Sequence, residues 1–442
     1  MMRRLLVGAV ALGLGVAGGV GGTVAGATPS GPRWVRELGN RWYQVGNGVA
    51  VDAAGNAYVV GETARTFPGS PTPSAGGDDA FLVKYNSRGK RLWTRQFGSG
   101  QSEGAYAVAV DALGNVDVVG TTDGTPAGSA DNNAGHDDVF VSRFTADGDA
   151  AWTHLLGRSD TENGFAVAGD AAGSIYVAGY SYERLPGAPE PFGGGSIDAF
   201  IAKYDTVGNV AWVHQIGTTG NEYATGLAAT PGGGVDVAGW TNGSFTGATQ
   251  NKGQTDIYLA HFDDDGTRAW LTDVGTKTFD NGNAVAVDSA GNAFVAGWTG
   301  ALPGTPGDQD VVVMEFDAGG ALLRTTTLGS TQGDEARGIA VDDADNVYVA
   351  GRTAGTLPGS LDPSAGGGDA FVARLTPGAG SHLRTVWIHQ LGSAQGDEAM
   401  AITATPNGTA TAVGYSAGTL PGSPRPYAGM DDLFVAQYRR GG

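Results

Sequence analysis

The stretch that decides the fold is GVAVDAAGNAYVVGETARTFPGSPTPSAGGDDAFLVKYNSRGKRLWTRQFG, residues 48–98. It contains four short runs rich in β-branched and aromatic residues: VAVD, NAYVVG, DAFLVKY and RLWTRQFG, named runs A to D. Such runs are typical of β-strands. Short glycine-bearing turns separate A from B at residues 52–56 and C from D around Gly89. We therefore expect four antiparallel strands joined partly by hairpins.

This unit recurs along the whole chain. The glycine that ends run B returns at intervals of 54 to 63 residues. Its seven positions are Gly61, Gly120, Gly179, Gly239, Gly297, Gly351 and Gly414. A four-stranded unit repeated radially is the blade of a β-propeller. The sequence thus predicts an all-β, seven-bladed β-propeller of four-stranded antiparallel blades.

Runs C and D are distributed in a way that predicts how the ring closes. Run D occurs at Trp34, Trp93, Trp152, Trp212, Trp270, Arg324 and Trp387. Run C begins at Asp79, Asp138, Asp198, Asp256, Asp310, Asp369 and Asp432. The first run D, residues 33–39, has no run C before it, and the last run C, residues 432–438, has no run D after it. We expect these two strands to pair and leave no open sheet edge. A straight solenoid would need polar capping repeats, and none is seen.

The unit resembles a known repeat family. Its motif G-x-A-V-D-x-x-G-N-x-Y-V-x-G, followed by Phe67-Pro68-Gly69 and G-G-x-D-A-F-x-x-K-Y, is similar to the SBBP beta-propeller repeat of bacterial surface and exported proteins. The resemblance covers residues 33–442 and implies binding or adhesive modules with no shared reaction. Two features depart from the pattern: Arg324 replaces the tryptophan of run D, and the second and fourth B–C loops lack the Leu/Phe-Pro-Gly step.

The amino-terminal segment differs from the repeats. Arg3 and Arg4 precede an apolar run and a small-residue exit at residues 25–27, which is the pattern of a cleaved signal peptide. We expect residues 1–27 to be removed and the mature chain to begin at Thr28; a permanent membrane helix is the alternative. Residues 28–442 then form a single propeller domain, secreted to the cell exterior by the general secretory or the twin-arginine route.

Composition excludes several classes of partner. Without Arg3 and Arg4 the formal charge is 24 − 45 = −21, and no basic patch remains for nucleic acid or an anionic membrane surface. The chain has no cysteine, so disulfides and thiolate metal sites are excluded. We expect a monomeric, exported protein whose mature chain does not insert into a membrane.

A repeated acidic position lies just after run D. Five residues beyond the glycine that closes run D, six of seven repeats carry a carboxylate. The positions are Gln44, Glu103, Glu162, Glu222, Asp280, Asp334 and Asp397. Because the next strand is the innermost of its blade, we expect these side chains to approach the central axis. They either cap backbone N–H groups of their own loops, which is the favoured interpretation, or converge on a cation such as Ca²⁺.

A second variable position follows the glycine of run B. It holds four aromatic residues on the face formed by the D–A and B–C loops. The seven residues are Glu62, Thr121, Tyr180, Trp240, Trp298, Arg352 and Tyr415. Aromatic faces beside carboxylates suit a carbohydrate or peptide ligand, although packing between blades is the more common use of such residues. Tyr180, Trp240, Trp298 and Tyr415 are therefore candidate ligand-binding residues together with the six acids.

Other repeated polar residues are predicted to be structural. An aspartate that opens run C in every repeat is expected to accept hydrogen bonds at a loop corner. The tryptophans of run D are expected to pack between blades. His154, His214 and His389 occupy one position in different repeats and cannot share a metal. Residues 263–266, DDDG, are expected to form a turn, because the downstream glutamate of a calcium loop is missing.

Two classes of function remain open. The first is a non-enzymatic propeller that binds a glycan, peptide or surface partner through the B–C and D–A loop face, with no catalytic residues and no assured cofactor. The second is an enzyme. Residues 205–212 resemble the D-x-x-G-x-x-x-W repeat of quinoprotein dehydrogenases, which commonly use a vicinal cysteine pair that this chain lacks. A glycan-cleaving propeller would need one carboxylate pair unlike its repeat neighbours.

Overall fold

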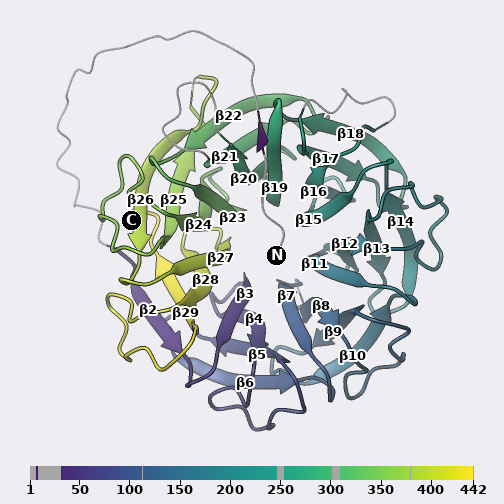
Figure 1. The fold of residues 1–442 in the computed structure, drawn as a ribbon, viewed down its shortest axis with the longest axis horizontal. Coiled ribbons are helices and arrows are strands. Elements are labelled where there is room, and N and C mark those ends of the chain that lie inside the picture. Colours follow the sequence, from purple (N-terminus) through teal and green to yellow (C-terminus); the bar gives the residue numbers. More distant parts are fainter. Residues whose placement is uncertain are drawn as a thin grey trace.

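The structure is a computed structural model that describes residues 6–7, 31–111, 113–245, 253–300, 309–378 and 380–441. In these residues the regular elements are all β-strands, arranged as seven antiparallel sheets in a ring around a central axis (Figure 1). The expected all-β, seven-bladed architecture is confirmed. Apart from Leu6–Val7, the predicted signal peptide lies outside the described residues, so its cleavage stays a prediction.

Each blade takes one strand from each of the four runs. The inner strands, from run A, are β3 (Gln44–Val51), β7 (Glu103–Val110), β11 (Glu162–Gly169), β15 (Glu222–Ala229), β19 (Thr278–Val287), β23 (Asp334–Val341) and β27 (Asp397–Ala404). The second strands are β4 (Ala57–Thr63), β8 (Val116–Thr122), β12 (Ile175–Ser181), β16 (Val235–Thr241), β20 (Ala293–Gly300), β24 (Val347–Thr353) and β28 (Ala410–Ser416).

The third and fourth strands complete the blades. The third strands are β5 (Asp79–Tyr85), β9 (Asp138–Phe144), β13 (Asp198–Tyr204), β17 (Asp256–Phe262), β21 (Gln309–Phe316), β25 (Asp369–Thr376) and β29 (Asp432–Tyr438). The outer strands are β6 (Arg91–Phe97), β10 (Ala150–Leu156), β14 (Val210–Ile216), β18 (Arg268–Val274), β22 (Leu322–Leu328), β26 (Arg384–Leu391) and β2 (Trp34–Leu38). Blades 1 to 7 are numbered by their inner strands. A short strand, β1 (Leu6–Val7), also pairs with β19.

Blade 7 is built from both ends of the repeat region. Strand β2 pairs antiparallel with β29, with Trp34 opposite Gln437 and Leu38 opposite Leu433. The Trp34 indole N–H also donates to Gln437 Oε1 at 3.1 Å. The pairing predicted for residues 33–39 and 432–438 is therefore present, and it gives blade 7 the same four-stranded order as its neighbours.

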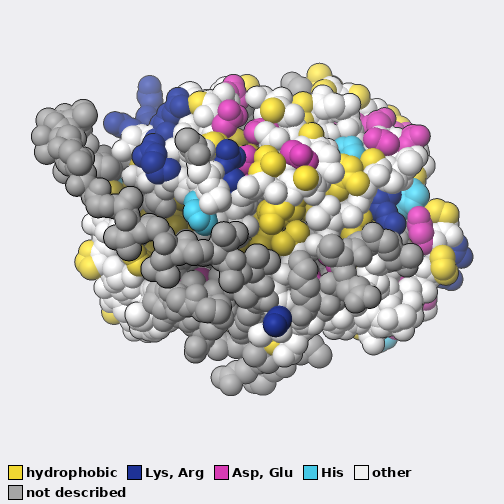
Figure 2. Space-filling model, turned by 90° about the horizontal axis from the view of Figure 1, so that it is seen from above, with side chains coloured by type: hydrophobic (Ala, Val, Ile, Leu, Met, Phe, Trp, Pro, Cys, Tyr) yellow, Lys and Arg dark blue, Asp and Glu magenta, His cyan; other side chains and the backbone are white. Residues whose placement is uncertain are grey.

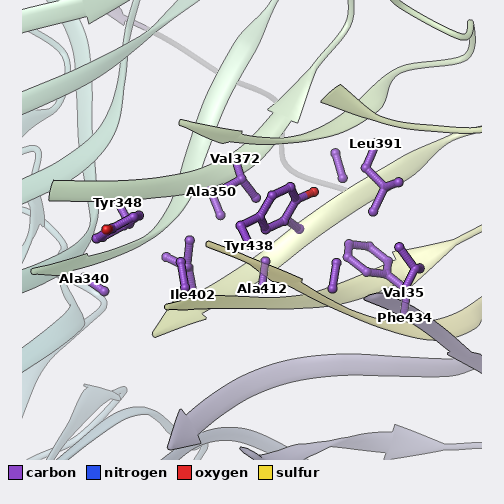
Figure 3. Packing of buried hydrophobic residues seen from close by; sticks show 14 of the residues in the cluster. Val35, Ala340, Tyr348, Ala350, Val372, Leu391, Ile402, Ala412, Phe434 and Tyr438 are labelled. Atoms are coloured by element: carbon purple, nitrogen blue, oxygen red, sulfur yellow. The ribbon is translucent and has the colours of Figure 1, made fainter. Parts of the chain in front are cut away.

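The core consists of seven apolar clusters, each lying between two adjacent blades. Figure 3 shows the cluster between blades 6 and 7, where Tyr348 and Val372 from blade 6 pack with Val35, Phe434 and Tyr438 from blade 7. Because every blade face meets another blade, the third strands are buried on both sides, for example DAFLVKY of β5. Blade-to-blade packing therefore provides most of the apolar burial that stabilises the fold.

Outer-strand tryptophans link each blade to the next. In the C–D turns of blades 1 to 5, a glycine lies against the tryptophan of the preceding blade. At Gly208, with φ +93°, an added Cβ would come within 3.0 Å of Trp152. In blade 5, where Arg324 replaces tryptophan, Nε donates instead to Gly380 O at 3.0 Å in the next C–D turn. The arginine thus preserves the link between blades by hydrogen bonding.

The outer surface carries both charged and apolar side chains. Figure 2 shows charged side chains of both signs interspersed with apolar ones on the side of the disc that it presents. The described part of the chain contains no helix with the length and apolarity that crossing a membrane requires.

Candidate functional site

The six predicted acids begin the inner strands or lie near their start, and they are buried. Their exposed fractions are 0 or 1%, and Gln44 in blade 1 is equally buried. Glu222 shows the shared arrangement: it accepts hydrogen bonds from the backbone N–H and hydroxyl of Thr218, both at 2.7 Å, and from the Thr241 hydroxyl at 2.6 Å. Each carboxylate therefore joins its D–A loop to the second strand of the same blade.

These carboxylates are not brought together. None of them lines the central channel; each stays within its own blade, where its oxygens are used by loop donors. Among the residues that the structure describes, no three His, Cys, Asp or Glu side chains are arranged to hold a metal ion. The geometry agrees with the interpretation that the acids cap their own loops, and calcium binding stays a prediction without a site in this part of the chain.

Burial raises the pKa of four of these acids. It raises the pKa of Glu162 to about 7, although hydrogen bonds from Ser181 and the backbone N–H of Arg158 lower it. Burial also raises the pKa values of Glu222, Asp334 and Asp397. The charged forms of these side chains are therefore costly inside the loops.

A different set of residues reaches the channel. Every inner strand contains a β-bulge three residues after the acidic position, because two residues of that strand oppose one residue of its neighbour. The bulged residues are Asn47, Tyr106, Phe165, Thr225, Asn283, Arg337 and Met400. All seven line the central cavity, whose volume is about 200 Å³. Bulges are a common way to redirect a side chain toward a functional site.

A second level of the channel lies below the bulges. Two residues further along each inner strand, a second ring of seven aliphatic side chains lines the cavity. It consists of Val49, Val108, Val167, Leu227, Val285, Ile339 and Ile402. The mouth on the loop face is therefore chemically varied, whereas the level beneath it is uniformly apolar.

Several bulged residues hold the mouth together by contacting the next blade. The side-chain amides of Asn47 and Asn283 donate to the carbonyls of Ala105 and Ala336, at 3.1 and 2.7 Å. These two carbonyls are equivalent, because each precedes the bulge of the following blade. The Thr225 hydroxyl binds the corresponding carbonyl, Gly282 O, at 2.7 Å. The polar bulged residues thus have a structural use in addition to lining the channel.

Blades 2 to 4 present a continuous arc of aromatic rings beside this mouth. Ring-centre distances link its neighbours at 5.6, 5.5, 5.9, 4.8 and 4.1 Å. In order, the pairs are Tyr106–Phe165, Phe165–Tyr180, Tyr180–Tyr182, Tyr180–Tyr223 and Tyr223–Trp240. We call these six residues the aromatic arc. Tyr182 is 40% exposed, and the other five are partly buried.

The opposite side of the mouth is charged. In blades 6 and 7, Arg337 lies between two carboxylates, with Nη1 2.9 Å from Glu335 Oε1 and Nε 2.6 Å from Glu398 Oε1. Burial alone would lower the pKa of Arg337, but the two carboxylates raise it. The Tyr415 hydroxyl completes the group by donating to Glu398 Oε2 at 3.0 Å.

The four aromatic candidates therefore separate into three environments. Tyr180 and Trp240 meet through Tyr223 in the aromatic arc. Trp298 is 7% exposed and lines a separate cavity between blades 5 and 6. Tyr415 belongs to the charged group of blade 7. Sequence reasoning missed the bulged residues and Tyr223; the signal that could have found them is that these positions differ from blade to blade within a conservative repeat.

The residues predicted to be structural lie within the blades. The run C aspartates cap B–C loops: Asp138 accepts from the Ala134 N–H at 2.7 Å. Burial raises the pKa values of Asp198 and Asp432 to about 6. The three run D histidines each bind a carboxylate of their own B–C loop, as in the His214 Nδ1 to Glu190 contact at 2.7 Å.

Together these features define a seven-bladed β-propeller with a chemically varied loop face. Comparison with known families shows that the chain carries SBBP beta-propeller repeats, matched at residues 33–65, 275–302 and 324–357. The first and third of these segments start in the outer strand of one blade and end after the second strand of the next. The repeat is therefore staggered relative to the blade, which is why the two ends of the repeat region share blade 7.

Two curated relatives are similar over most of this chain. The regulatory protein FlaEY of Caulobacter vibrioides is 27% identical over 96% of this chain and 42% of its own length. An uncharacterized WD repeat-containing protein of Acanthamoeba polyphaga mimivirus is 22% identical over 72% of this chain and 31% of its own length. The chain thus spans less than half the length of either relative.

A solved structure has a similar fold. The ulvan lyase of polysaccharide lyase family PL25 superposes with a TM-score of 0.50, covering 94% of this chain and 97% of its own, at 12% identity. At that level of identity the likeness concerns the fold alone.

Proposed function

We propose that this protein is an exported, non-catalytic binding module that recognises a glycan, a peptide or a surface partner through its B–C and D–A loop face. The observation that carries the proposal is the aromatic arc. Its rings are linked across three blades, and Tyr182 is 40% exposed. Partly exposed tyrosine and tryptophan rings provide rigid apolar contact area beside polar groups, which suits ligands of this kind.

The distribution of the acids also supports binding over catalysis. Hydrolysis of a glycosidic bond commonly requires two carboxyl groups flanking one bond. Here the repeated acids lie one to a blade and accept hydrogen bonds from their own loops, as Glu103 does from the Ser99 N–H at 2.6 Å. The residues that differ between blades, and so could select a ligand, are instead those at the mouth of the channel.

The test is binding of the purified chain to glycan and peptide arrays, with and without Ca²⁺. We expect the double substitution Tyr182→Ala with Trp240→Ala to abolish binding of array ligands while leaving the melting temperature nearly unchanged. The matched control is Trp42→Ala, because Trp42 is 37% exposed in the D–A loop between blades 7 and 1, outside the aromatic arc.

The possible results separate the alternatives. Loss of binding only in the arc variant supports the proposal. Equal binding by the wild type and the arc variant would contradict it, as would turnover of a bound ligand, which would identify an enzyme.

A further inference from the structure

A cavity between blades 5 and 6 is distinct from the aromatic arc. Its volume is about 450 Å³, enough for one monosaccharide unit. Trp298 and Gln309 line it from blade 5, and Gln332, Glu335 and Arg352 line it from blade 6. Asp334 also lines it, so the lining combines one aromatic side chain, two amides, two carboxylates and a guanidinium group.

Arg352 has hydrogen-bonding capacity to spare. It occupies the position after the run B glycine, where the other blades have Glu, Thr or an aromatic residue. Its guanidinium lies against Gly368, where an added Cβ would meet Nη2 at 2.6 Å. In the described part of the chain its guanidinium makes one hydrogen bond, a long one from Nη2 to Gly367 O at 3.5 Å. Among the described residues no carboxylate lies within 4.0 Å of it, so most of its donors remain for a ligand.

The two carboxylates of the cavity differ in whether they can accept a hydrogen bond from a ligand. Asp334 is buried and accepts from the N–H and the hydroxyl of Ser330. Glu335 binds Arg337 and Asn283 through Oε1 alone, while Oε2 receives no hydrogen bond from the described residues. Since the Glu335 side chain is 23% exposed, Oε2 can accept a hydrogen bond from a ligand in the cavity.

We propose that this cavity binds a saccharide unit that bears a carboxylate, such as a terminal uronate; this inference rests on the proposed binding function. Arg352 binds the ligand carboxylate through two N–H groups, the geometry in which guanidinium and carboxylate match best. The sugar ring contacts Trp298, and a ring hydroxyl donates to Glu335 Oε2. Gln309 and Gln332 provide amide groups for the remaining hydroxyls.

The lining favours a sugar over an amino acid. A free amino acid would also place its carboxylate on Arg352. Its side chain would then lie among the amide groups of the cavity, where Trp298 and Ala354 are the apolar contacts. The chain's formal charge of −19 opposes an anion at long range. At physiological ionic strength that field is screened beyond about 8 Å, so the direct contact with Arg352 dominates.

The experiment is calorimetric titration with an oligosaccharide that ends in glucuronate and with its glucose-ended counterpart. We expect the wild type to prefer the glucuronate ligand and Arg352→Thr to weaken that binding by roughly 10- to 100-fold, because hydrogen bonds to a charged group are lost. Threonine is the residue that blade 2 has at this position, Thr121, so the fold should tolerate it. Arg65→Thr is the matched control, because Arg65 lies over the exposed Trp42 elsewhere on the face.

Each result has a defined meaning. Preference for glucuronate that is lost in Arg352→Thr and kept in Arg65→Thr supports the inference. Array ligands that bind without a carboxylate preference, or independently of Arg352, overturn the inference while the proposed function stands. A free amino acid whose binding depends on Arg352, with no binding of glucuronate, also overturns it. Failure of every array and titration ligand overturns both proposals.

Discussion

At the scale of single residues, Glu162 shows how a repeated acid can serve the fold. Its buried carboxylate accepts hydrogen bonds from the Arg158 N–H and the Ser181 hydroxyl, both at 2.7 Å. Blade 1 has Gln44 at the same place, and Gln44 Oε1 accepts from the Asn40 N–H at 2.7 Å. An amide can therefore replace the carboxylate without loss of this contact.

This comparison predicts a pH effect at Glu162. Burial raises its pKa to about 7, above an unfolded value near 4.5, so the folded state holds the proton more tightly. The stability from this group is fully present below pH 4.5 and is lost as pH rises through 7, by up to about 3 kcal/mol. We expect Glu162→Gln to remove this part of the pH dependence. Urea unfolding of both proteins at pH 4.5, 6 and 8 measures it; parallel curves would refute the assignment.

A second residue-scale prediction concerns the pair Glu315–Arg324. The two residues face each other across β21 and β22, where blade 1 pairs Lys84 with Trp93. The Glu315 side chain is 5% exposed, so Arg324→Trp alone leaves a buried carboxylate without its cation and should cost about 3 kcal/mol. We expect the double variant Glu315→Lys with Arg324→Trp to recover most of that loss.

The measurement is a double-mutant cycle in denaturant, with Glu315→Lys as the other single variant. Additive losses in the double variant would mean that the two sites are independent. The interpretation that Glu315 compensates for the replacement of the tryptophan by Arg324 would then be wrong.

At the scale of elements, the strands and turns were predictable because each depends on local chemistry. Residues of β3 alternate between buried and partly buried over its first half, whereas every residue of β5 is buried, including Asp79 and Lys84. The bulges were not predictable in the same way. One extra residue at Asn47 or Phe165 leaves the apolar pattern nearly unchanged, yet it shifts the register and turns a different side chain toward the axis.

The candidate site was therefore only partly predictable. The residue after the run B glycine was predicted to lie on the loop face. The structure places Tyr180 and Trp240 in the aromatic arc, and Trp298 at the separate cavity between blades 5 and 6. The partners of this residue come from neighbouring blades, as in the contact of Tyr180 with Tyr223. These two residues are 43 positions apart in the sequence, so no local sequence pattern predicts that they meet. The acids are different, because their regular spacing in the sequence indicated a residue that caps its own loop in every blade.

Interblade turns give an element-scale prediction. Gly208 has φ +93°, and an added Cβ would lie 2.9 Å from His154 and 3.0 Å from Trp152 in the preceding blade. Gly187 has a similar φ of +84° with no atom within 4 Å of the added Cβ. Alanine at either site incurs a left-handed backbone cost of about 1–2 kcal/mol. We expect Gly208→Ala to cost at least about 1 kcal/mol more, because overpacking adds to it.

Thermal and urea unfolding of the two alanine variants measure this difference directly. Equal destabilisation would show that the turn does not press on the tryptophan of the neighbouring blade.

At the scale of the whole molecule, stability depends on seven similar interfaces arranged in a closed ring. The cluster between blades 6 and 7 includes Val35 from β2 together with Phe434 and Tyr438 from β29 (Figure 3). The buried Glu37 of β2 also accepts from the Leu420 N–H at 3.1 Å, which fixes the B–C loop of blade 7. The two ends of the repeat region therefore contribute to a blade as fully packed as any other.

This closure makes the last strand essential. A chain truncated after Met430 loses β29, which exposes the edges of β2 and β28 and the apolar cluster beneath them. We expect the truncated chain to lose its single cooperative unfolding transition and to become sensitive to proteases. Recovery of a cooperative, protease-resistant monomer would contradict ring closure through blade 7.

The truncated chain lacks both the β2–β29 pairing and the residues of β29, and a circular permutant separates these two effects. Joining residue 442 to residue 31 would connect β29 to β2 by a C–D turn, as β5 is connected to β6, and the new ends can be placed in the C–D turn at residues 205–209. Every interface between blades and every strand pair within the seven four-stranded blades is then kept, and only the β1–β19 pair is lost. We expect the permutant to unfold cooperatively within about 1 kcal/mol of the parent, because loop closure costs change little with loop length. Cooperative unfolding of the permutant together with collapse of the truncated chain would establish that the ring is held by the β2–β29 pairing; an unstable permutant would show that chain order, and not that pairing, determines the fold.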